Sequence, residues 1–111
     1  MRDDQLHALR GLLAGALAAQ KRQYDHSAAL WHMMLDTGDD HATSHDRELV
    51  RAAADRAGDA IGEIEAALDR LAEGTYGTCE SCSRPIPFER LEAISQARYC
   101  VACPRPSGPL R

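Results

Sequence analysis

All four cysteines of the 111-residue chain lie in its last third, arranged as two C-x-x-C pairs. The first pair is Cys79 and Cys82, the second is Cys100 and Cys103, and 17 residues separate the pairs. Zn²⁺ prefers four tetrahedral ligands, at about 2.3 Å when they are thiolates, and each C-x-x-C turn supplies two. Two such turns with roughly 15–20 residues between them are a recognised zinc-site spacing. We therefore expect one structural Zn²⁺, because a closed four-thiolate site leaves no position open for catalysis.

A pair of disulfides is the alternative use of these cysteines, and it would suit a small secreted domain. The N-terminus argues against secretion, because Met1-Arg2-Asp3-Asp4 opens with acidic residues and lacks the apolar core of a signal peptide. The chain also has no run of about 20 apolar residues, so no membrane span is expected. Thiols held by zinc in a chain without an export signal indicate a cytoplasmic protein.

The residues around the cysteines resemble a known zinc finger. Tyr76–Cys82 reads Y-G-T-C-E-S-C, and Pro85–Pro87, Arg90–Ala93 and Cys100–Cys103 follow it. This order is similar to the pattern of the bacterial DksA/TraR family, [FY]-G-x-C-x-x-C-x-x-x-I-x-x-x-R-L-x-A and then a second C-x-x-C. The similarity covers 28 residues without a gap, with Ser95 standing where many members have proline. The resemblance implies a C4-type zinc finger over residues 74–104.

The residues before the finger predict two long helices. From Asp3 to Leu35 there is no proline, and apolar or small residues recur at steps of three and four, which keeps them on one helix face. Gly11 and Gly15 in this helix are expected to permit close approach of a partner helix. The apolar face consists of Leu6, Leu9, Leu13, Leu17, Tyr24, Ala28, Trp31 and Leu35.

The second helix, predicted from about Ser44 to Ala72, has the cleaner periodicity. Its apolar positions step 4-3-4-3-4-3, which is the seam of a coiled coil. Gly74 follows the helix at a position where glycine commonly ends helices. The seam consists of Val50, Ala54, Ala57, Ile61, Ile64, Leu68 and Leu71.

Together these elements predict a mainly α fold. Two helices joined by a short turn run antiparallel, so residues 1–73 are expected to form a long antiparallel two-helix coiled-coil hairpin with its turn at about 36–43. The small four-cysteine zinc finger follows at 74–104. The proline-rich residues 105–111 are expected to be a disordered tail, because proline cannot continue a helix.

The resemblance also implies a function. DksA/TraR-like proteins bind bacterial RNA polymerase at its secondary channel, insert the tip of a helical hairpin toward the active site, and alter transcription initiation. Their tip motif resembles D-x-x-D-x-A. Asp36 and Asp39 have the spacing of the two acids, whereas Asp40 and Ala42 have the spacing of D-x-A, and both alignments stay open. Longer relatives contribute to an alarmone site with a helix after the last cysteine pair, and a proline-rich tail stands there in this chain, so alarmone binding is not implied.

The other charged side chains carry weaker signals. Arg84, Arg90 and Arg98 surround the finger, either as solvated charge or as candidate docking residues for an acidic protein surface. The net charge is −4 without a basic stripe, so sequence-specific nucleic-acid binding is not expected. Histidines near the turn are interpreted as polar surface and not as a second metal site; they are His32, His41 and His45.

Catalysis is not expected from this sequence. It has no nucleophile motif and no Gly-rich phosphate loop, and a two-helix hairpin offers no pocket that would tune paired carboxylates. We expect a non-enzymatic regulator that binds RNA polymerase as a monomer and does not act at a membrane. The alternative is a zinc-stapled helical adaptor that dimerises through its alanine-rich seam and has no role at the polymerase.

Overall fold

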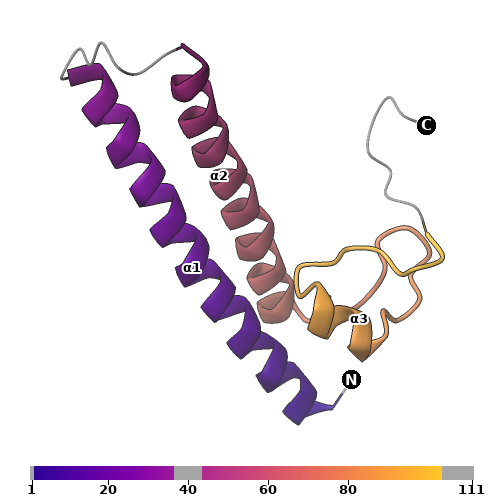
Figure 1. Cartoon of the computed structure of the whole chain (residues 1–111). Coiled ribbons are helices and arrows are strands. Elements are labelled where there is room, and N and C mark those ends of the chain that lie inside the picture. The colour runs from indigo at the N-terminus through magenta and orange to yellow at the C-terminus, as the bar shows by residue number, and fades with distance from the viewer. Residues whose placement is uncertain (1, 37–43, 104–111) are drawn as a thin grey trace. The chain divides into compact units, whose positions relative to one another are not determined.

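The computed structural model describes residues 2–36 and 44–103, and most of these residues are α-helical. Helix α1 spans Asp3–Asp36, α2 spans Ser44–Glu73 and the short α3 spans Phe88–Ala93 (Figure 1). Across these residues no strand forms, although Thr78 and Pro85 make an isolated antiparallel bridge. The predicted fold class is confirmed, and both long helices end within one residue of the predicted ends. Of the turn predicted at about 36–43, Asp36 is the last residue of α1. The rest of that turn and the predicted tail at 105–111 lie outside the described residues.

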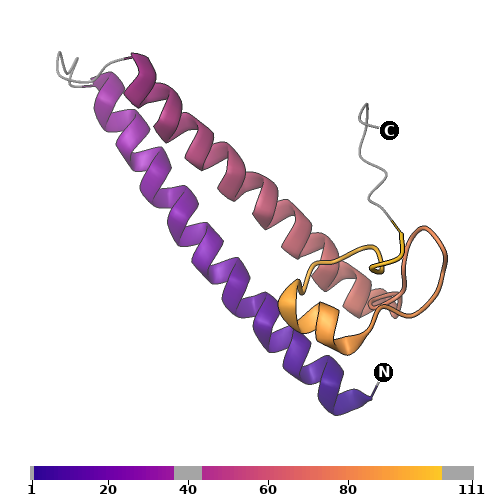
Figure 2. The same ribbon diagram turned by 45° about the vertical axis from the view of Figure 1, so that its right-hand side comes forward.

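The chain divides into two compact units, Met1–Ala14 with Ile64–Arg111, and Gly15–Glu63. In each unit a segment of α1 lies beside a segment of α2 and runs antiparallel to it (Figures 1 and 2). The first unit also contains α3 and the four cysteines, and the second unit contains the helix ends that flank the predicted turn. Within the described part of the chain, no helix is long and apolar enough to cross a membrane.

The predicted seam of α2 is confirmed, because none of its seven residues is exposed. Ala57 and Ile64 retain only 3% and 2% of their accessible surface. The residues on the opposite face, such as Asp55 and Asp59, are exposed. A seam in which every position is apolar or small therefore identifies the packed face of this helix correctly.

The predicted apolar face of α1 is correct at six of its eight residues, which are buried or half-buried, and wrong at Tyr24 and Leu35. Leu9 and Leu13 are fully buried, but Tyr24 and Leu35 are 43% and 55% exposed. Ser27 is buried instead, at 2% exposure, and its Oγ accepts a 3.3 Å hydrogen bond from Nε2 of Gln23. A serine whose hydroxyl is paired can be buried at little cost. The packed face of α1 therefore includes the polar side chain of Ser27 beside Ala28 and Trp31, which are half-buried as predicted.

The glycines of α1 do not have the predicted role. A Cβ atom built on Gly11 or Gly15 would meet no atom within 4 Å, so neither glycine is needed for close helix approach. At Gly58 of α2 a Cβ atom would lie 3.8 Å from Cε1 of Tyr24, which is ordinary van der Waals contact and does not require glycine either. The ring of Tyr24 thus lies over a small residue of α2 while its outer part remains exposed.

Helix α2 ends in a glycine cap that leads the chain into the finger. Gly74 has a left-handed φ of +82°, a conformation that costs glycine little. The N–H groups of Thr75 and Tyr76 both donate to the Arg70 carbonyl, at 2.9 and 3.2 Å. The hydrogen bond from Thr75 is the 6→1 bond of a Schellman motif, which satisfies carbonyls at the end of a helix. The predicted end of the helix at Gly74 is confirmed.

The core of the first unit rests on α1 side chains whose removal should be costly. We expect Leu13→Ala to lower the free energy of unfolding by about 2–5 kcal/mol, because a fully buried leucine leaves a cavity. Leu12→Ala is the matched control; Leu12 is 46% exposed, and its loss should cost less than about 1 kcal/mol. Urea unfolding followed by circular dichroism, with zinc in excess, measures both. Equal losses for the two variants would contradict the assigned packing of α1.

Candidate metal centre

The first C-x-x-C pair lies in a tight loop closed by backbone hydrogen bonds. The Cys79 N–H donates to the Arg84 carbonyl at 2.9 Å, and the Ser83 N–H donates to the Cys79 carbonyl at the same distance. Ser83 has a φ of 64°, in the left-handed region that tight turns require. The Ile86 N–H donates to the Gly77 carbonyl at 2.8 Å and fixes the base of the loop. Together these bonds make a knuckle that presents two thiols.

The second C-x-x-C pair follows α3 and a short irregular segment. The Cys103 N–H donates to the Cys100 carbonyl at 3.2 Å, which turns the chain between the two cysteines. The Glu80 N–H donates to the Arg98 carbonyl at 2.9 Å and joins the first knuckle to the segment before the second. Buried side chains of Ile86, Leu91 and Ala97 form the apolar interior of this region. The two knuckles are therefore brought together by protein contacts as well as by their thiols.

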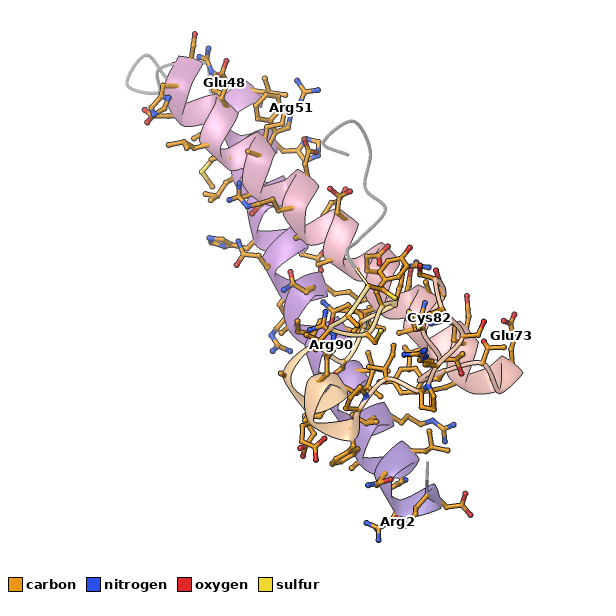
Figure 3. The ribbon with its side chains drawn as sticks, turned by 90° about the vertical axis from the view of Figure 1, so that its right-hand side faces the viewer. Arg2, Glu48, Arg51, Glu73, Cys82 and Arg90 are labelled. Atoms are coloured by element: carbon orange, nitrogen blue, oxygen red, sulfur yellow. The ribbon has the colours of Figure 1, made fainter. Side chains whose placement is uncertain are left out.

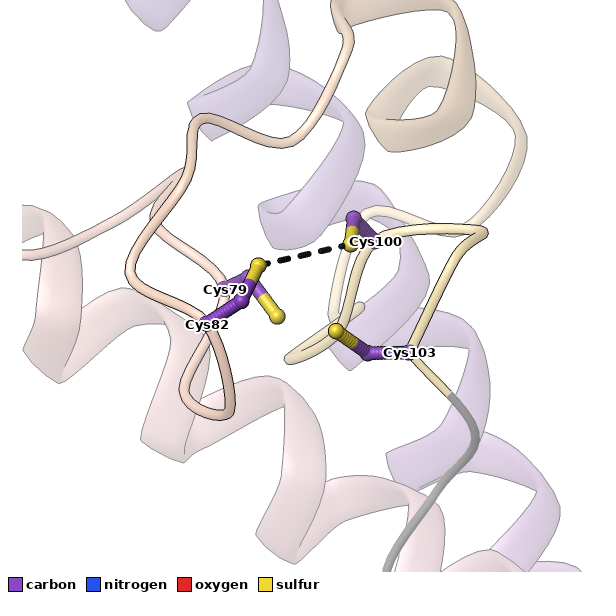
Figure 4. A group of neighbouring side chains, drawn as sticks. All are labelled: Cys79, Cys82, Cys100 and Cys103. Carbon is purple, nitrogen blue, oxygen red and sulfur yellow. Dashed lines mark hydrogen bonds between the residues drawn. The ribbon is translucent and has the colours of Figure 1, made fainter.

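The four cysteine side chains converge on one point (Figure 4). Their sulfur atoms all lie within 4.8 Å of one another, and the Cys82 and Cys100 sulfurs are 3.7 Å apart. Four thiolates at about 2.3 Å from a tetrahedral zinc ion are separated from each other by roughly 3.8 Å. All four are free cysteines, so the disulfide alternative is not what the structure shows. The donor set is thus arranged to hold one zinc ion.

Burial differs among the four cysteines in a way that suits a structural site. Cys79 and Cys100 retain 1% and 8% of their accessible surface, while Cys103 is half-buried and Cys82 is exposed. One side of the site therefore faces the apolar interior and the other faces solvent. With four sulfur donors the coordination shell is complete, so the metal would stabilise the fold and would not bind a substrate.

In the metal-free site the pKa values of the cysteine thiols differ from one another. Burial raises the pKa of Cys79, but hydrogen bonds from the backbone of Cys100, Cys82 and Ser81 outweigh it and lower the pKa to about 6. The pKa of Cys103 is raised to about 12, chiefly by its contacts with the thiols of Cys100 and Cys82. One thiol is thus ionised easily while another holds its proton. Only a cation placed among them would allow all four to be thiolates together.

The arginines near the finger differ in their surroundings. Arg90 donates from Nε to the Tyr99 carbonyl at 2.9 Å. Arg98 forms an ion pair with Glu80, with a shortest distance of 3.2 Å from Nη1 to Oε2. The side chain of Arg84 is exposed. Arg90 and Arg98 are therefore engaged within the finger, and Arg84 is the one of these three with an exposed side chain.

Two contributors to the finger were missed by the sequence analysis. Tyr76 donates from its hydroxyl to the Ser95 carbonyl at 2.7 Å, and burial raises its pKa to about 12. Arg70, at the end of α2, donates from Nη2 to the Gln96 carbonyl at 3.4 Å. Both acceptors are backbone carbonyls, so the sequence contains no pair of complementary side chains from which these contacts could be predicted. The aromatic residue before Gly77 was visible as part of the motif but not as a hydrogen-bond donor.

The predicted tip residues fall mostly outside the described part of the structure. Asp36 is the last residue of α1, and Asp39, Asp40 and Ala42 belong to residues 37–43, which are not described. Of the histidines near the turn, His32 and His45 are exposed and His41 is not described. Among the described residues, the four cysteines are the group that could hold a metal ion.

Residues 74–106 match the family model of the prokaryotic dksA/traR C4-type zinc finger. The predicted resemblance is therefore confirmed for this segment, and with it the prediction of a zinc site made by four cysteines. The described fold is also similar to the solved structure of transcription factor DksA2 from Pseudomonas aeruginosa. That likeness has a TM-score of 0.82 at 23% identity and covers 92% of this chain and 81% of the other. It shows the fold alone.

Curated relatives match over shorter stretches. The RNA polymerase-binding transcription factor DksA of Caulobacter vibrioides is 40% identical over 66 residues, 60% of this chain and 46% of that protein. General stress protein 16O of Bacillus subtilis is 46% identical over 41 residues, 37% of this chain and 25% of its own length. An uncharacterised protein of Aquifex aeolicus is 51% identical over 43 residues, 39% of this chain and 30% of its length. The chain thus spans less than half the length of the relatives it matches.

Removing one ligand should disrupt the finger and spare the helices. We expect Cys100→Ser to lose stoichiometric zinc and to weaken the amide protection of the finger residues 76–103. The helical circular dichroism signal should largely remain, because α1 and α2 supply 34 and 30 residues of helix. Glu89→Gln, at an exposed residue of α3, is the control that should keep one zinc per chain. Zinc content by elemental analysis decides the matter, and wild-type protein purified without chelator but free of zinc would contradict the assignment.

Zinc binding should release protons and strengthen as pH rises. The metal-free Cys103 thiol, with its pKa raised to about 12, is protonated at pH 7 and must lose that proton when it binds the ion. Calorimetric titrations at pH 7 in buffers of different ionisation enthalpy should therefore report net proton release. Chelator competition should give a tighter apparent Kd at pH 8 than at pH 6. An affinity that stays constant over this range would contradict the assigned protonation of the site.

Proposed function

We propose that this protein is a DksA/TraR-type transcription regulator that binds RNA polymerase, on the premise that residues 74–106 match the family model of the DksA/TraR C4-type zinc finger. The observation that carries the proposal is the combination of this finger with an antiparallel helical hairpin of the DksA2 fold. A finger alone would suit many adaptor proteins, and a helical hairpin alone would suit more. The curated relative from Caulobacter vibrioides, 40% identical over 66 residues, is an RNA polymerase-binding factor by name.

We place the polymerase-facing end at the turn between α1 and α2. The described helix ends on either side of it carry exposed apolar side chains, Met33 and Leu35 on α1 and Leu49 on α2, at 59%, 55% and 56% exposure. Large apolar side chains are enriched where proteins contact a partner. The turn itself carries acidic residues in sequence, which suit an approach to a cationic surface. The hairpin tip would therefore enter the secondary channel with a negatively charged turn and an apolar collar behind it.

The tip residues would act in one of the two alignments that the sequence leaves open. In one, Asp36 and Asp39 provide the paired acids; in the other, Asp40 and Ala42 provide the D-x-A element. Asp36 ends α1, so the first alignment draws one acid from the helix and one from the turn. The second places both functional residues within the turn. The two alignments predict different sensitivities to Asp36→Asn, which separates them experimentally.

The finger would serve as a structural base and docking surface. Its one zinc ion stabilises the loop that holds the four cysteines, and its complete coordination shell leaves no catalytic role. Arg84 is the best candidate for contact with an acidic polymerase surface, because its side chain is exposed. Arg90 and Arg98 would support docking through the shape they give to the finger. The protein would act in the cytoplasm as a monomer, without reading a nucleic-acid sequence.

Association with core RNA polymerase tests the proposal directly. We expect the wild-type protein to be retained by immobilised core polymerase at micromolar concentration. We expect Asp39→Asn combined with Asp40→Asn to bind with little loss but to lose the effect on initiation in a transcription assay. The control is Asp55→Asn combined with Asp59→Asn, at exposed residues on the outer face of α2.

Two results would contradict the proposal. One is the absence of association at low salt, where charge attraction is strongest. The other is a stable dimer by light scattering that buries the hairpin, which would favour the adaptor alternative.

A further inference from the structure

The segment that leads into the second knuckle is held by donors from elsewhere in the finger and from α2. Residues 94–99 have no regular secondary structure. Even so, four of the five carbonyls of residues 95–99 accept hydrogen bonds. The accepting residues are Ser95, Gln96, Arg98 and Tyr99, and the donors belong to Tyr76, Arg70, Glu80 and Arg90 respectively.

The two strongest side-chain contacts lie at the two ends of this segment. The Tyr76 hydroxyl holds the Ser95 carbonyl at 2.7 Å, just after α3. The Arg90 Nε atom holds the Tyr99 carbonyl at 2.9 Å, in the peptide group that joins Tyr99 to Cys100. The Arg70 contact with Gln96, at 3.4 Å, is longer and weaker. The position of Arg90 in the finger can be followed in Figure 3.

These contacts use no thiol, so they can form before a metal arrives. A loop that is free in the metal-free protein must lose its conformational entropy when its cysteines bind, and this cost weakens metal affinity. A loop already held by hydrogen bonds has lost much of that freedom. Partners one step away from the ligands commonly change metal affinity by 10- to 100-fold when they are removed.

We propose that Arg90 and Tyr76 are positioning residues of the zinc site. They hold the backbone of residues 95–99 so that Cys100 and Cys103 face Cys79 and Cys82 before the ion binds. Arg90 acts at the peptide next to Cys100, and Tyr76 acts at the start of the segment. Burial supports this assignment, because Tyr76 and Cys100 are both buried, at 8% exposure each. The inference concerns zinc binding alone and does not depend on the polymerase proposal.

Zinc affinity of single variants tests the inference. We expect Arg90→Gln to weaken zinc binding about tenfold and Tyr76→Phe about fivefold, by competition with a chromophoric chelator. Zinc release to excess chelator should accelerate by similar factors. Arg84→Gln and Tyr24→Phe are the matched controls, because they make the same chemical changes at exposed side chains. Both controls should stay within twofold of the wild-type affinity.

Two further measurements separate positioning from a general loss of structure. Cobalt(II) should give the same four-thiolate absorption spectrum in Arg90→Gln, Tyr76→Phe and wild type, because the ligands are unchanged. Amide exchange in the metal-free proteins should rise over residues 94–103 in both variants and stay unchanged in α1. Affinities of Arg90→Gln and Tyr76→Phe equal to those of the controls would overturn the inference. A wild-type protein without a four-thiolate cobalt spectrum would instead overturn the zinc site itself.

Discussion

The finger depends above all on bringing four sulfur atoms to one point. Zinc–thiolate bonds have a narrow range of length, so two knuckles 17 residues apart must be placed to within a fraction of an ångström. The chain meets this requirement in two ways that do not involve the metal. Ile86, Leu91 and Ala97 make a small apolar interior, and hydrogen bonds hold the carbonyls of residues 95–99. The ion then completes a site whose shape the protein has largely set.

The same contacts join the finger to the end of α2. The Arg70 carbonyl caps the helix by accepting from Thr75 and Tyr76, while the Arg70 guanidinium donates to Gln96 in the segment before the second knuckle. Tyr76 belongs to both sides of this junction, since its N–H caps the helix and its hydroxyl binds Ser95. Loss of the Tyr76 or Arg70 contacts would therefore disturb the last turn of α2 as well as the segment before the second knuckle. The end of α2 and the finger accordingly belong to one compact unit, together with the first residues of α1.

The sequence predicted the parts whose signal lies in residue type and spacing. Cysteine spacing identified the metal site, and the uniform apolar seam of α2 identified its packed face. On α1 the prediction missed Ser27, which is buried while its hydroxyl accepts a hydrogen bond from Gln23, because a hydrophobic pattern assigns serine to the surface. It also placed Tyr24 and Leu35 on the packed face, although both are exposed. The contacts of Arg90 and Tyr76 were not predictable, because their acceptors are carbonyl groups that every residue has.

The proposed contact with a partner would explain the acidic residues between α1 and α2. In the sequence, three aspartates fall within five residues, and like charges this close repel one another. The exposed side chains of Met33, Leu35 and Leu49 add an apolar surface, and burial of such a surface against a partner would be favourable. Both the charge repulsion and the exposure of apolar surface would be reduced if a larger assembly bound this end of the hairpin. Under the proposed function, affinity would come mainly from the apolar collar and the finger, whereas the effect on transcription would come from the aspartates. A variant with a neutralised turn would then still bind the polymerase channel and would compete with active regulators for that channel.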